Sequence, residues 1–365
     1  MKNRLRSIIL SSFCLCCISL KAQKKEATNV VLITLDGFRW QELFTGADAK
    51  LIANKEFTHD SISLKAKYWR NSPEERRKAL LPFIWGELLE MGQIHGNRVL
   101  GSKVSLTNKK LFSYPGYNEI LSGLADDERI DSNNKFNNPN KTVLEIVNTS
   151  AKYKGKVAAF GSWDVFPFII NEERSGVPVN GGYEKATELP LSENEVLLNK
   201  LEGQIPERWS TVRFDAFTHH YTIEYMKKEH PSLVYIAYGE TDDFAHEGEY
   251  DAYLKSANNT DSLLKDLWEF TQSDSFYMDN TVFIISSDHG RGTEPIETWK
   301  HHGSDIVGAD QVWLMVYGKK VNPLGEVAKK EQLYSIQIAP TVLDVLNIKI
   351  DTEVMKGKPI SILKK

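Results

Sequence analysis

The stretch NVVLITLD, residues 29–36, carries the clearest evidence for the fold. Its residues are mostly apolar or β-branched, and the run ends at Asp36. Such a run is typical of a strand that is buried on both faces of a parallel sheet. Two other stretches have the same form: LVYIAYGETD, residues 233–242, reaches Asp242, and VFIISSDHG, residues 282–290, contains Asp288 and His289. The sequence therefore predicts several buried strands that each end in an acidic residue.

Helical patterns alternate with these strands along the chain. The predicted strands cover residues 29–35, 233–238, 281–286 and 311–317, with a weaker one at 156–160, and the predicted helices cover 74–91, 142–153, 213–228, 250–272 and 332–346. This alternation predicts an α/β fold, with a mostly parallel central sheet and helices on both faces. Residues 46–110 and 171–209 fit the alternation poorly. We expect them to be insertions that cap or shape the site, within one catalytic domain over residues 23–365.

The N-terminal segment has the pattern of a signal peptide over residues 1–22. Three basic residues precede an apolar run over residues 7–20, and Ala22 is a small residue suited to cleavage. The alternative is an uncleaved membrane anchor, but the run is shorter than the roughly 20 residues that span a bilayer. We therefore expect an exported protein, periplasmic or extracellular, without a stable membrane anchor.

Cysteine content and charge exclude some classes of site and partner. Cys14, Cys16 and Cys17 all lie in the predicted signal peptide, so residues 23–365 can form neither disulfides nor thiolate metal ligands. These residues hold 41 basic and 49 acidic side chains, a net charge of −8. Such a balance gives no electrostatic basis for a nucleic acid as a specific partner. An anionic substrate would need local positive charge, for example from bound cations.

Aspartate and histidine residues gather where the predicted strands end. In an open α/β sheet, ligands bind at the carboxyl ends of the strands, so three acids at that edge should converge. One such Asp often caps the next helix, but three of them with histidines nearby point to a metal site. Mixed Asp and His ligands suit zinc or another borderline divalent ion. The candidates are Asp36, Asp242, His246, Asp288, His289 and one residue of the pair His301 and His302.

A candidate nucleophile stands in the segment LFSYPGYNEILSG, which begins at Leu111. Pro115 is favourable early in a helix, so Ser113 is expected just before a helix N-terminus. Free backbone N–H groups and the helix dipole there favour an anion. A simple capping role for Ser113 is the alternative.

Taken in order, the motifs VLITLDGFRW, SYPGYNEILSG, D-x-x-x-H, SDHGRG and HHG resemble the alkaline phosphatase superfamily, and most of all its type I phosphodiesterase/nucleotide pyrophosphatase branch. The resemblance covers about residues 29–348. It implies two divalent metal ions, zinc with Mn²⁺ as the alternative. One site would use Asp36, Ser113, Asp288 and His289, and the other Asp242, His246 and His302. His302 is preferred over His301 because it directly precedes Gly303.

The resemblance also implies the reaction. It predicts a hydrolase that cleaves small phosphate monoesters or diesters through a phosphoseryl intermediate on Ser113. The superfamily uses an Asn about twenty residues after the nucleophile to bind a phosphoryl oxygen, and Asn133 and Asn134 both have that spacing. The branch usually has T-F-P-N-H where this chain has Ser113 to Tyr117, so its Asn and His are replaced. His302 also follows His289 by only thirteen residues, a shorter separation than the branch usually has.

Other readings of the same residues stay open. A sulfatase needs C/S-x-P-x-R, and Tyr117 stands where that motif has Arg. A cofactor-independent phosphoglycerate mutase is larger, and a non-catalytic phosphate or metal binder should have lost part of this residue set. Arg39 and Arg291 could contact phosphate or form buried structural pairs. Substrate identity, the preference between monoesters and diesters, and the oligomeric state do not follow from the sequence.

Overall fold

The computed structural model describes residues 28–351 and 353–364, so the predicted signal peptide lies outside the described residues. A central sheet of eight strands has the order β10-β2-β9-β7-β1-β6-β4-β5. Five neighbouring strands of this sheet are parallel, and they form its core. They are β7 (Thr281–Ser286), β1 (Asn29–Leu35), β6 (Leu233–Tyr238), β4 (Val157–Gly161) and β5 (Val179–Gly181). The predicted α/β class with a mostly parallel sheet is confirmed.

The strands beyond β7, towards the opposite edge of the sheet, are partly antiparallel. There β9 (Leu314–Tyr317) runs antiparallel to β7 and to β2 (Gly92–His95), which pairs with β10 (Gly325–Glu326). A second, three-stranded sheet contains β11 (Glu331–Tyr334), β3 (Ser102–Ser105) and β8 (Gln311–Val312). The prediction of one strand over residues 311–317 is therefore wrong. The run divides at buried Trp313, whose indole N–H donates to the Phe38 carbonyl at 2.8 Å, and its two halves join different sheets.

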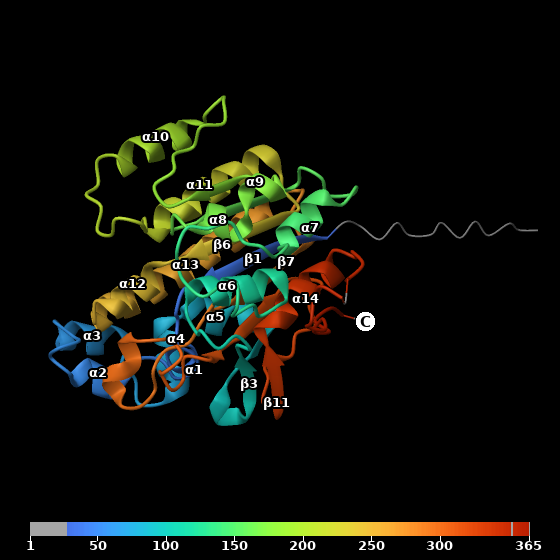
Figure 1. Ribbon diagram of the computed structural model, residues 1–365. Helices are drawn as coiled ribbons and strands as arrows, with labels where there is room; N and C mark the ends of the chain where they lie inside the picture. Colours follow the sequence, from blue (N-terminus) through green and yellow to red (C-terminus); the bar gives the residue numbers. More distant parts are fainter. Residues whose placement is uncertain (1–27, 352, 365) are drawn as a thin grey trace, which may run out of the picture.

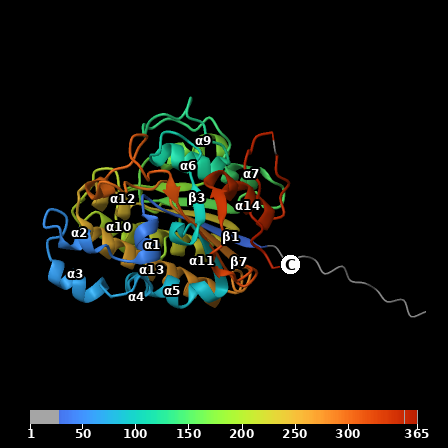
Figure 2. The same cartoon turned by 90° about the horizontal axis from the view of Figure 1, so that it is seen from below.

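Helices cover both faces of the central sheet (Figure 2). Alternate residues of β1 point to opposite faces, so Val31 and Ile33 join one hydrophobic cluster and Val30 and Leu32 join the other. The first cluster includes side chains of α4 (Pro73–Leu80), α5 (Pro82–Gly86), α11 (Asp215–Glu229) and α13 (Tyr250–Ser273). The second includes side chains of α6 (Ser113–Ser122), α7 (Val143–Thr149), α8 (Phe166–Ile170) and α14 (Ile338–Val345). The sheet is thus the middle layer of three (Figure 1).

Two predicted helices are divided into shorter elements. The pattern over residues 74–91 divides into α4, α5 and the 3-10 turn η1 (Leu88–Met91), because Pro82 begins a new helix and has no N–H for the old one. The pattern over 332–346 contains β11 and the 3-10 turn η4 (Ser335–Gln337) before α14 begins at Ile338. The helices predicted at 213–228 and 250–272 are present as α11 and α13, and the one predicted at 142–153 is present as α7 but ends already at Thr149.

The two irregular stretches contain short elements around the sheet. Residues 46–110 form α2 (Ala49–Ala53), α3 (Ser61–Tyr68), α4, α5, η1, β2, the 3-10 turn η2 (Arg98–Leu100) and β3, after α1 (Trp40–Thr45). Residues 171–209 form α9 (Glu172–Ser175), the edge strand β5 and α10 (Glu193–Glu202). In Figure 1, α10 lies at the outer edge of the molecule, and it exposes Val196, Leu197 and Leu201.

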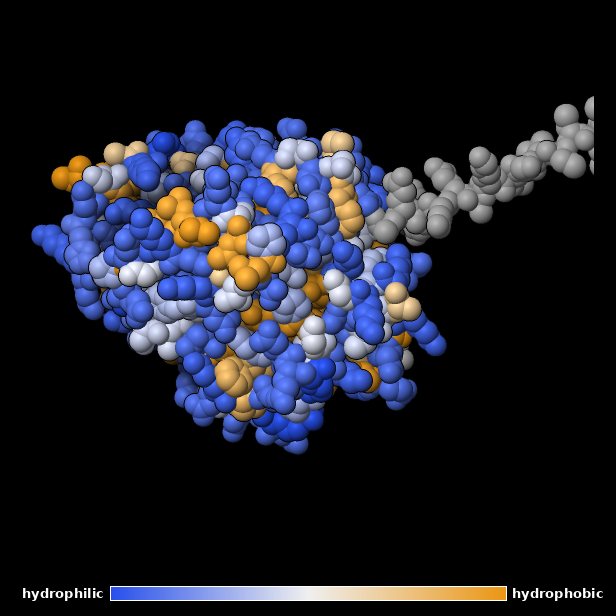
Figure 3. Space-filling view, turned by 90° about the horizontal axis from the view of Figure 1, so that it is seen from above, coloured by the Kyte–Doolittle hydropathy of each residue, from blue (hydrophilic) through white to orange (hydrophobic). Residues whose placement is uncertain are grey.

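The face in Figure 3 is mostly hydrophilic, with small separate hydrophobic patches. Among the helices that the structure describes, none combines the length and the apolar character needed to cross a membrane.

Candidate active site

Three neighbouring strands bring the candidate residues to one edge of the sheet. Because β1 pairs in parallel with both β6 and β7, the carboxyl ends of the three strands lie side by side. Asp36 directly follows β1, and Asp288 and His289 follow β7 after one serine. After β6 the chain enters α12 (Glu240–His246), which carries Asp242. The edge that the sequence predicted is therefore the place where these acids converge.

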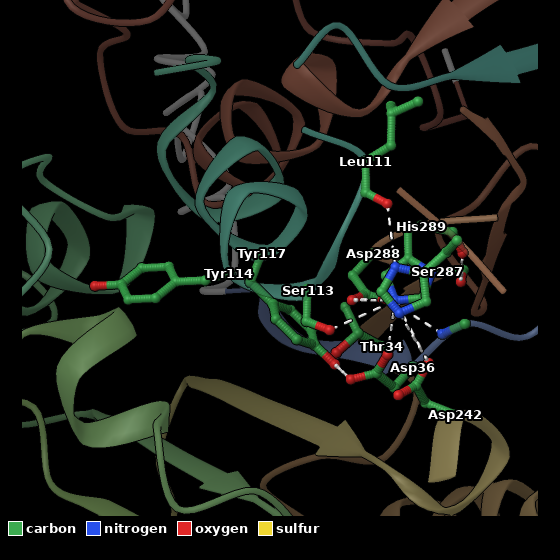
Figure 4. A network of polar contacts seen from close by, with 12 residues as sticks. Thr34, Asp36, Leu111, Ser113, Tyr114, Tyr117, Asp242, Ser287, Asp288 and His289 are labelled. Atoms are coloured by element: carbon green, nitrogen blue, oxygen red, sulfur yellow. Dashed lines mark hydrogen bonds and ion pairs between the residues drawn. The ribbon is translucent and has the colours of Figure 1, made fainter. Parts of the chain in front are cut away.

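The first group of side chains surrounds the His289 ring (Figure 4). The Nε2 atom of His289 lies 3.2 Å from Asp36 Oδ1 and 3.6 Å from Asp288 Oδ2. It lies 3.5 Å from the Ser113 hydroxyl. The other ring nitrogen, Nδ1, donates to the Gly290 carbonyl at 2.9 Å, which leaves the lone pair of Nε2 directed at the group. All four side chains are buried.

The second group consists of Asp242, His246 and His302. His246 Nε2 lies 3.2 Å from Asp242 Oδ2 and 2.9 Å from His302 Nε2, and His302 Nε2 lies 3.9 Å from Asp242 Oδ1. Asp242 and His246 share one face of α12, as their spacing predicted. His301 is exposed, and its neighbour His302 is the residue that enters the group. Asp242 Oδ1 lies 3.5 Å from His289 Nε2, so the two groups adjoin.

Electrostatics make this site unfavourable without a cation. Burial, and next the charge of Asp242, raises the pKa of Asp36 well above its ordinary value, and burial with Asp36 and Asp242 does the same for the pKa of Asp288. Burial opposes ionisation of Asp242 too, but Arg291 and His246 hold its pKa well below the ordinary value. Burial lowers the pKa of His289 to about 4, so the imidazole is neutral at pH 7.

The His302 imidazole is also neutral at pH 7, because burial and the neighbouring His289 lower its pKa to about 2. A neutral imidazole is the protonation state of histidine that metal coordination requires.

The hydrogen bonds around the carboxylates leave one oxygen of each for a ligand. Asp36 Oδ2 accepts from the Tyr117 hydroxyl at 2.7 Å, and Asp288 Oδ1 accepts from the Gly37 N–H at 3.1 Å. The remaining oxygens, Asp36 Oδ1 and Asp288 Oδ2, are buried with no hydrogen-bond donor among the described residues. Both face the lone pair of His289 Nε2, and acceptors in contact repel each other. A divalent cation between them removes that repulsion, so these residues fit a metal of the zinc type.

Ser113 is the first residue of α6, a fully buried helix of ten residues. The third residue, Pro115, costs no intrahelical hydrogen bond, because the first turn has no partners for its N–H groups. Gly116 allows α6 to approach the strand end closely, since a Cβ there would lie 2.2 Å from the Asp288 carbonyl oxygen. The glycine that replaces Asn of the branch motif thus lets the helix that begins with Ser113 lie close to a candidate metal ligand.

The two candidate asparagines differ in their contacts. Asn133 Oδ1 accepts from the backbone N–H of Tyr114 at 3.0 Å, which places Asn133 beside Ser113 at the start of α6. Asn134 makes its hydrogen bonds through its backbone: its N–H lies 3.5 Å from the Ser132 hydroxyl, and its carbonyl accepts from the Phe136 N–H at 3.0 Å. Both are exposed. The geometry therefore favours Asn133 over Asn134 as the residue near Ser113.

Both candidate arginines are buried in structural pairs. Arg39 pairs with Glu42 and also donates to the Gly292 carbonyl at 3.2 Å. Arg291 pairs with Asp242 and donates to the carbonyls of Gly37 at 3.1 Å and Lys300 at 2.8 Å. These bonds occupy the guanidinium groups, so a structural role is favoured for both arginines over contact with phosphate.

Some supporting residues were not predicted from the sequence. Asp215 accepts from the Gly239 N–H at 2.7 Å, the Ser162 hydroxyl at 2.6 Å and the Glu240 N–H at 3.2 Å. These bonds fix the start of α12 and so the position of Asp242. An acid in the first turn of a helix is visible in the sequence, but its partners on another element are not. The role of Tyr117 towards Asp36 was missed for the same reason.

A third set of possible metal ligands lies on α11 and α13, away from Ser113. It contains His219, His220 and Asp266. Both nitrogens of His219 already have partners, Tyr238 at 2.9 Å and Asp266 at 2.9 Å. We therefore interpret His219 as a buried histidine whose two ring nitrogens both have hydrogen-bond partners and which links α11 to α13.

Comparisons with known proteins agree with the geometry. A family model described as the metalloenzyme superfamily matches residues 179–350, the segment that contains Asp242, His246, Asp288, His289 and His302. Among solved structures, alkaline phosphatase PafA has a TM-score of 0.63 at 11% identity, over 93% of this chain and 99% of that chain. The chain has the alkaline phosphatase superfamily fold.

Other structures with this fold have different activities in their names. The lipoteichoic acid synthase LtaP from Listeria monocytogenes has a TM-score of 0.58 at 13% identity, over 91% of this chain and 74% of that one. The phosphonate monoester hydrolase SpPMH from Silicibacter pomeroyi has a TM-score of 0.53 at 14% identity, over 91% of this chain and 76% of that one. No curated protein sequence matches the chain.

The expected alkaline phosphatase-like fold is confirmed, and the phosphodiesterase branch stays a prediction.

Proposed function

We propose that this protein is an exported, metal-dependent hydrolase that cleaves phosphate monoesters or diesters with Ser113 as the nucleophile. One observation supports this proposal most: the Ser113 hydroxyl lies 3.5 Å from His289 Nε2, at a helix N-terminus. Two buried carboxylate oxygens without a donor among the described residues lie in the same group. The backbone N–H groups at a helix N-terminus stabilise negative charge, so they favour the ionised form of this hydroxyl.

The residues that would hold the metal ions follow the two groups. Asp36, Ser113, Asp288 and His289 would hold one ion, and Asp242, His246 and His302 the other. Bound there, two divalent ions would supply positive charge that favours the ionised Ser113 hydroxyl and offsets negative charge on the transferring group. The mixed Asp and His ligands favour Zn²⁺, with Mn²⁺ as the alternative. Because Arg39 and Arg291 are engaged in buried pairs, the metal ions would be the main source of positive charge for the substrate.

Ser113 would carry out the covalent step. Its oxygen forms a bond to phosphorus while the bond from phosphorus to the leaving oxygen breaks, which gives a phosphoseryl intermediate and the alcohol after protonation from solvent. Water then cleaves the bond from Ser113 to phosphorus, releases phosphate or a phosphomonoester, and restores the hydroxyl. The backbone N–H groups at the start of α6 favour negative charge at this position.

Asn133 would orient the phosphoryl group. Its Oδ1 is bonded to the Tyr114 N–H, so the side-chain NH₂ is the end that can donate to a non-bridging oxygen. This role makes Asn133 the better candidate of the two asparagines.

Hydrolysis assays on matched aryl esters test the proposal. Purified protein, either loaded with zinc or treated with a chelator, is offered an aryl phosphate monoester, a diester, a phosphonate monoester and a sulfate. Zinc-dependent hydrolysis of a phosphate ester is expected, and the ratio of monoester to diester rates assigns the preference. Hydrolysis of the sulfate alone would favour the sulfatase alternative, and zinc binding without turnover of any ester would favour the non-catalytic binder. N-terminal sequencing of protein recovered from outside the cytoplasm tests cleavage after Ala22.

A further inference from the structure

Tyr117 lies beneath the candidate metal centre, and its hydroxyl donates to Asp36 Oδ2 at 2.7 Å (Figure 4). Tyr117 is fully buried. The same carboxylate offers its other oxygen, Oδ1, to the group around His289 at 3.2 Å. The hydroxyl therefore occupies one oxygen of Asp36 and leaves the other directed at the metal position.

The core holds the Tyr117 ring in place. Phe166 packs edge-on against it, with ring centroids 4.9 Å apart. Phe166 in turn fills the space beside Gly161, where a Cβ would lie 2.1 Å from the Phe166 ring. A side chain at position 161 would displace Phe166 and, through it, Tyr117. The aromatic contacts thus set the position of a hydroxyl that points at a charged group.

Tyr117 also shares a helix with the nucleophile. It stands four residues after Ser113 on α6, so the two side chains lie on neighbouring turns of one face. Helix α6 is fixed against the backbone of Asp288 through Gly116. One rigid helix therefore carries the nucleophile, contacts the backbone of one candidate ligand and holds the side chain of another.

We propose that Tyr117 is a positioning residue: it fixes Asp36 as a ligand through Oδ1 alone and so sets the position of the metal ion that would contact Ser113. This inference rests on the proposed function. A donor to a ligating carboxylate restrains its rotation and satisfies its second oxygen, and loss of such a partner typically lowers metal affinity about 10- to 100-fold.

The matched control is Tyr114, another buried tyrosine of the same helix. Its hydroxyl donates to the Phe136 carbonyl at 2.7 Å, and Figure 4 shows the ring pointing away from the metal centre. Tyr114→Phe and Tyr117→Phe each remove one hydroxyl and keep the ring, so they differ in whether the lost bond reaches a metal ligand. The full chain is titrated with zinc alone against a competing chelator, and melting temperature and aryl ester hydrolysis are measured in parallel.

For Tyr117→Phe we expect one of two zinc equivalents to bind about 10- to 100-fold more weakly and the other to be unchanged. Tyr114→Phe should keep both affinities within twofold of the wild-type protein. A Tyr117→Phe variant that binds both zinc ions with the affinity of the wild-type protein overturns the inference. In that case ester hydrolysis by the wild-type protein still supports the proposed function. Wild-type protein that binds no zinc overturns both.

Anomalous diffraction from zinc-soaked crystals of the wild-type protein tests the inference without a variant. We expect zinc at about 2.0–2.2 Å from Asp36 Oδ1, with the bond from Tyr117 to Oδ2 intact. Coordination through both oxygens of Asp36, or a Tyr117 side chain turned away from it, overturns the inference.

Discussion

The Nε2 atom of His289 lies 3.2 Å from Oδ1 of Asp36, although 253 residues separate the two in the chain. The parallel pairing of β1 with β7 brings them together, because both strands end at the same edge of the sheet. The contact joins a lone pair to a carboxylate oxygen without a donor, so it is unfavourable while Asp36 is ionised unless a cation lies nearby.

Replacing the nucleophile should remove turnover and leave the fold intact. We expect Ser113→Ala to lower kcat by on the order of 10³-fold or more, because Ser113 carries the one hydroxyl among Asp36, Ser113, Asp288 and His289. The control is Ser122→Ala on the same helix, whose hydroxyl donates to the Asn118 carbonyl at 2.6 Å and not to the site. Steady-state hydrolysis of an aryl phosphate compares them. Equal activity in Ser113→Ala and Ser122→Ala would rule out Ser113 as the nucleophile.

The two asparagines should separate in the same assay. We expect Asn133→Ala to lower kcat/KM by roughly 10- to 100-fold, since a hydrogen bond to a charged oxygen contributes about 1.5–3 kcal/mol. Asn134→Ala should stay within twofold of the wild-type protein. A larger loss in Asn134→Ala than in Asn133→Ala would reverse this assignment.

Two acids of the same site should affect metal-free stability in opposite directions. The pKa of Asp36 is raised, first by burial, so its ionised form destabilises the folded state at pH 7. Metal-free Asp36→Asn should therefore unfold at a higher temperature than metal-free wild-type protein. Asn keeps an acceptor for the Tyr117 hydroxyl and offers an N–H to His289.

For Asp242 the sign is the reverse. Its pKa is held well below the ordinary value against the effect of burial, by Arg291 and His246, so its charge stabilises the folded state above the unfolded pKa. Asp242→Asn should lower the metal-free melting temperature, because it leaves the buried Arg291 without its carboxylate partner. Calorimetry of chelator-treated proteins at pH 7 measures both changes. Equal shifts of one sign would contradict this charge arrangement.

The contact between α6 and the strand end gives a steric prediction. A Cβ at Gly116 would lie 2.2 Å from the Asp288 carbonyl, so Gly116→Ala must push α6 away. We expect a loss of about 1–3 kcal/mol in the free energy of unfolding, together with lower activity. Gly86→Ala is the control, because a Cβ there meets nothing within 4 Å and alanine is a better helix former than glycine. Denaturant unfolding distinguishes them, and a Gly116→Ala variant as stable as Gly86→Ala would show that the helix has room to move.

Much of the fold and most of the site could be predicted from strand patterns. Buried strands have uninterrupted apolar runs, and the residue after each run marks the sheet edge, which is why Asp36, Asp242 and Asp288 could be grouped before the structure was known. The break at Pro82 was also visible in the sequence, but periodicity alone suggested one helix. The division at Trp313 was not visible, because it depends on a bond to the Phe38 carbonyl 275 residues away.

The supporting contacts of the site could not be predicted. Tyr117 meets Asp36 across 81 residues, and Asp215 meets Glu240 across 25. These pairs depend on how helices settle on the sheet, and no local pattern encodes that packing. The choice of His302 over His301 could be made from the sequence, because His302 directly precedes Gly303, whereas the choice of Asn133 over Asn134 needed the contact between Asn133 Oδ1 and the Tyr114 N–H.

Hydrolysis of an aryl phosphate monoester and diester by the purified protein, with zinc and after chelation, tests the central proposal most directly. Turnover of at least one ester that disappears with the chelator, returns with zinc and is absent in Ser113→Ala is the predicted result. Turnover that survives complete metal removal, or that Ser113→Ala retains in full, would contradict a metal-held serine nucleophile at this site.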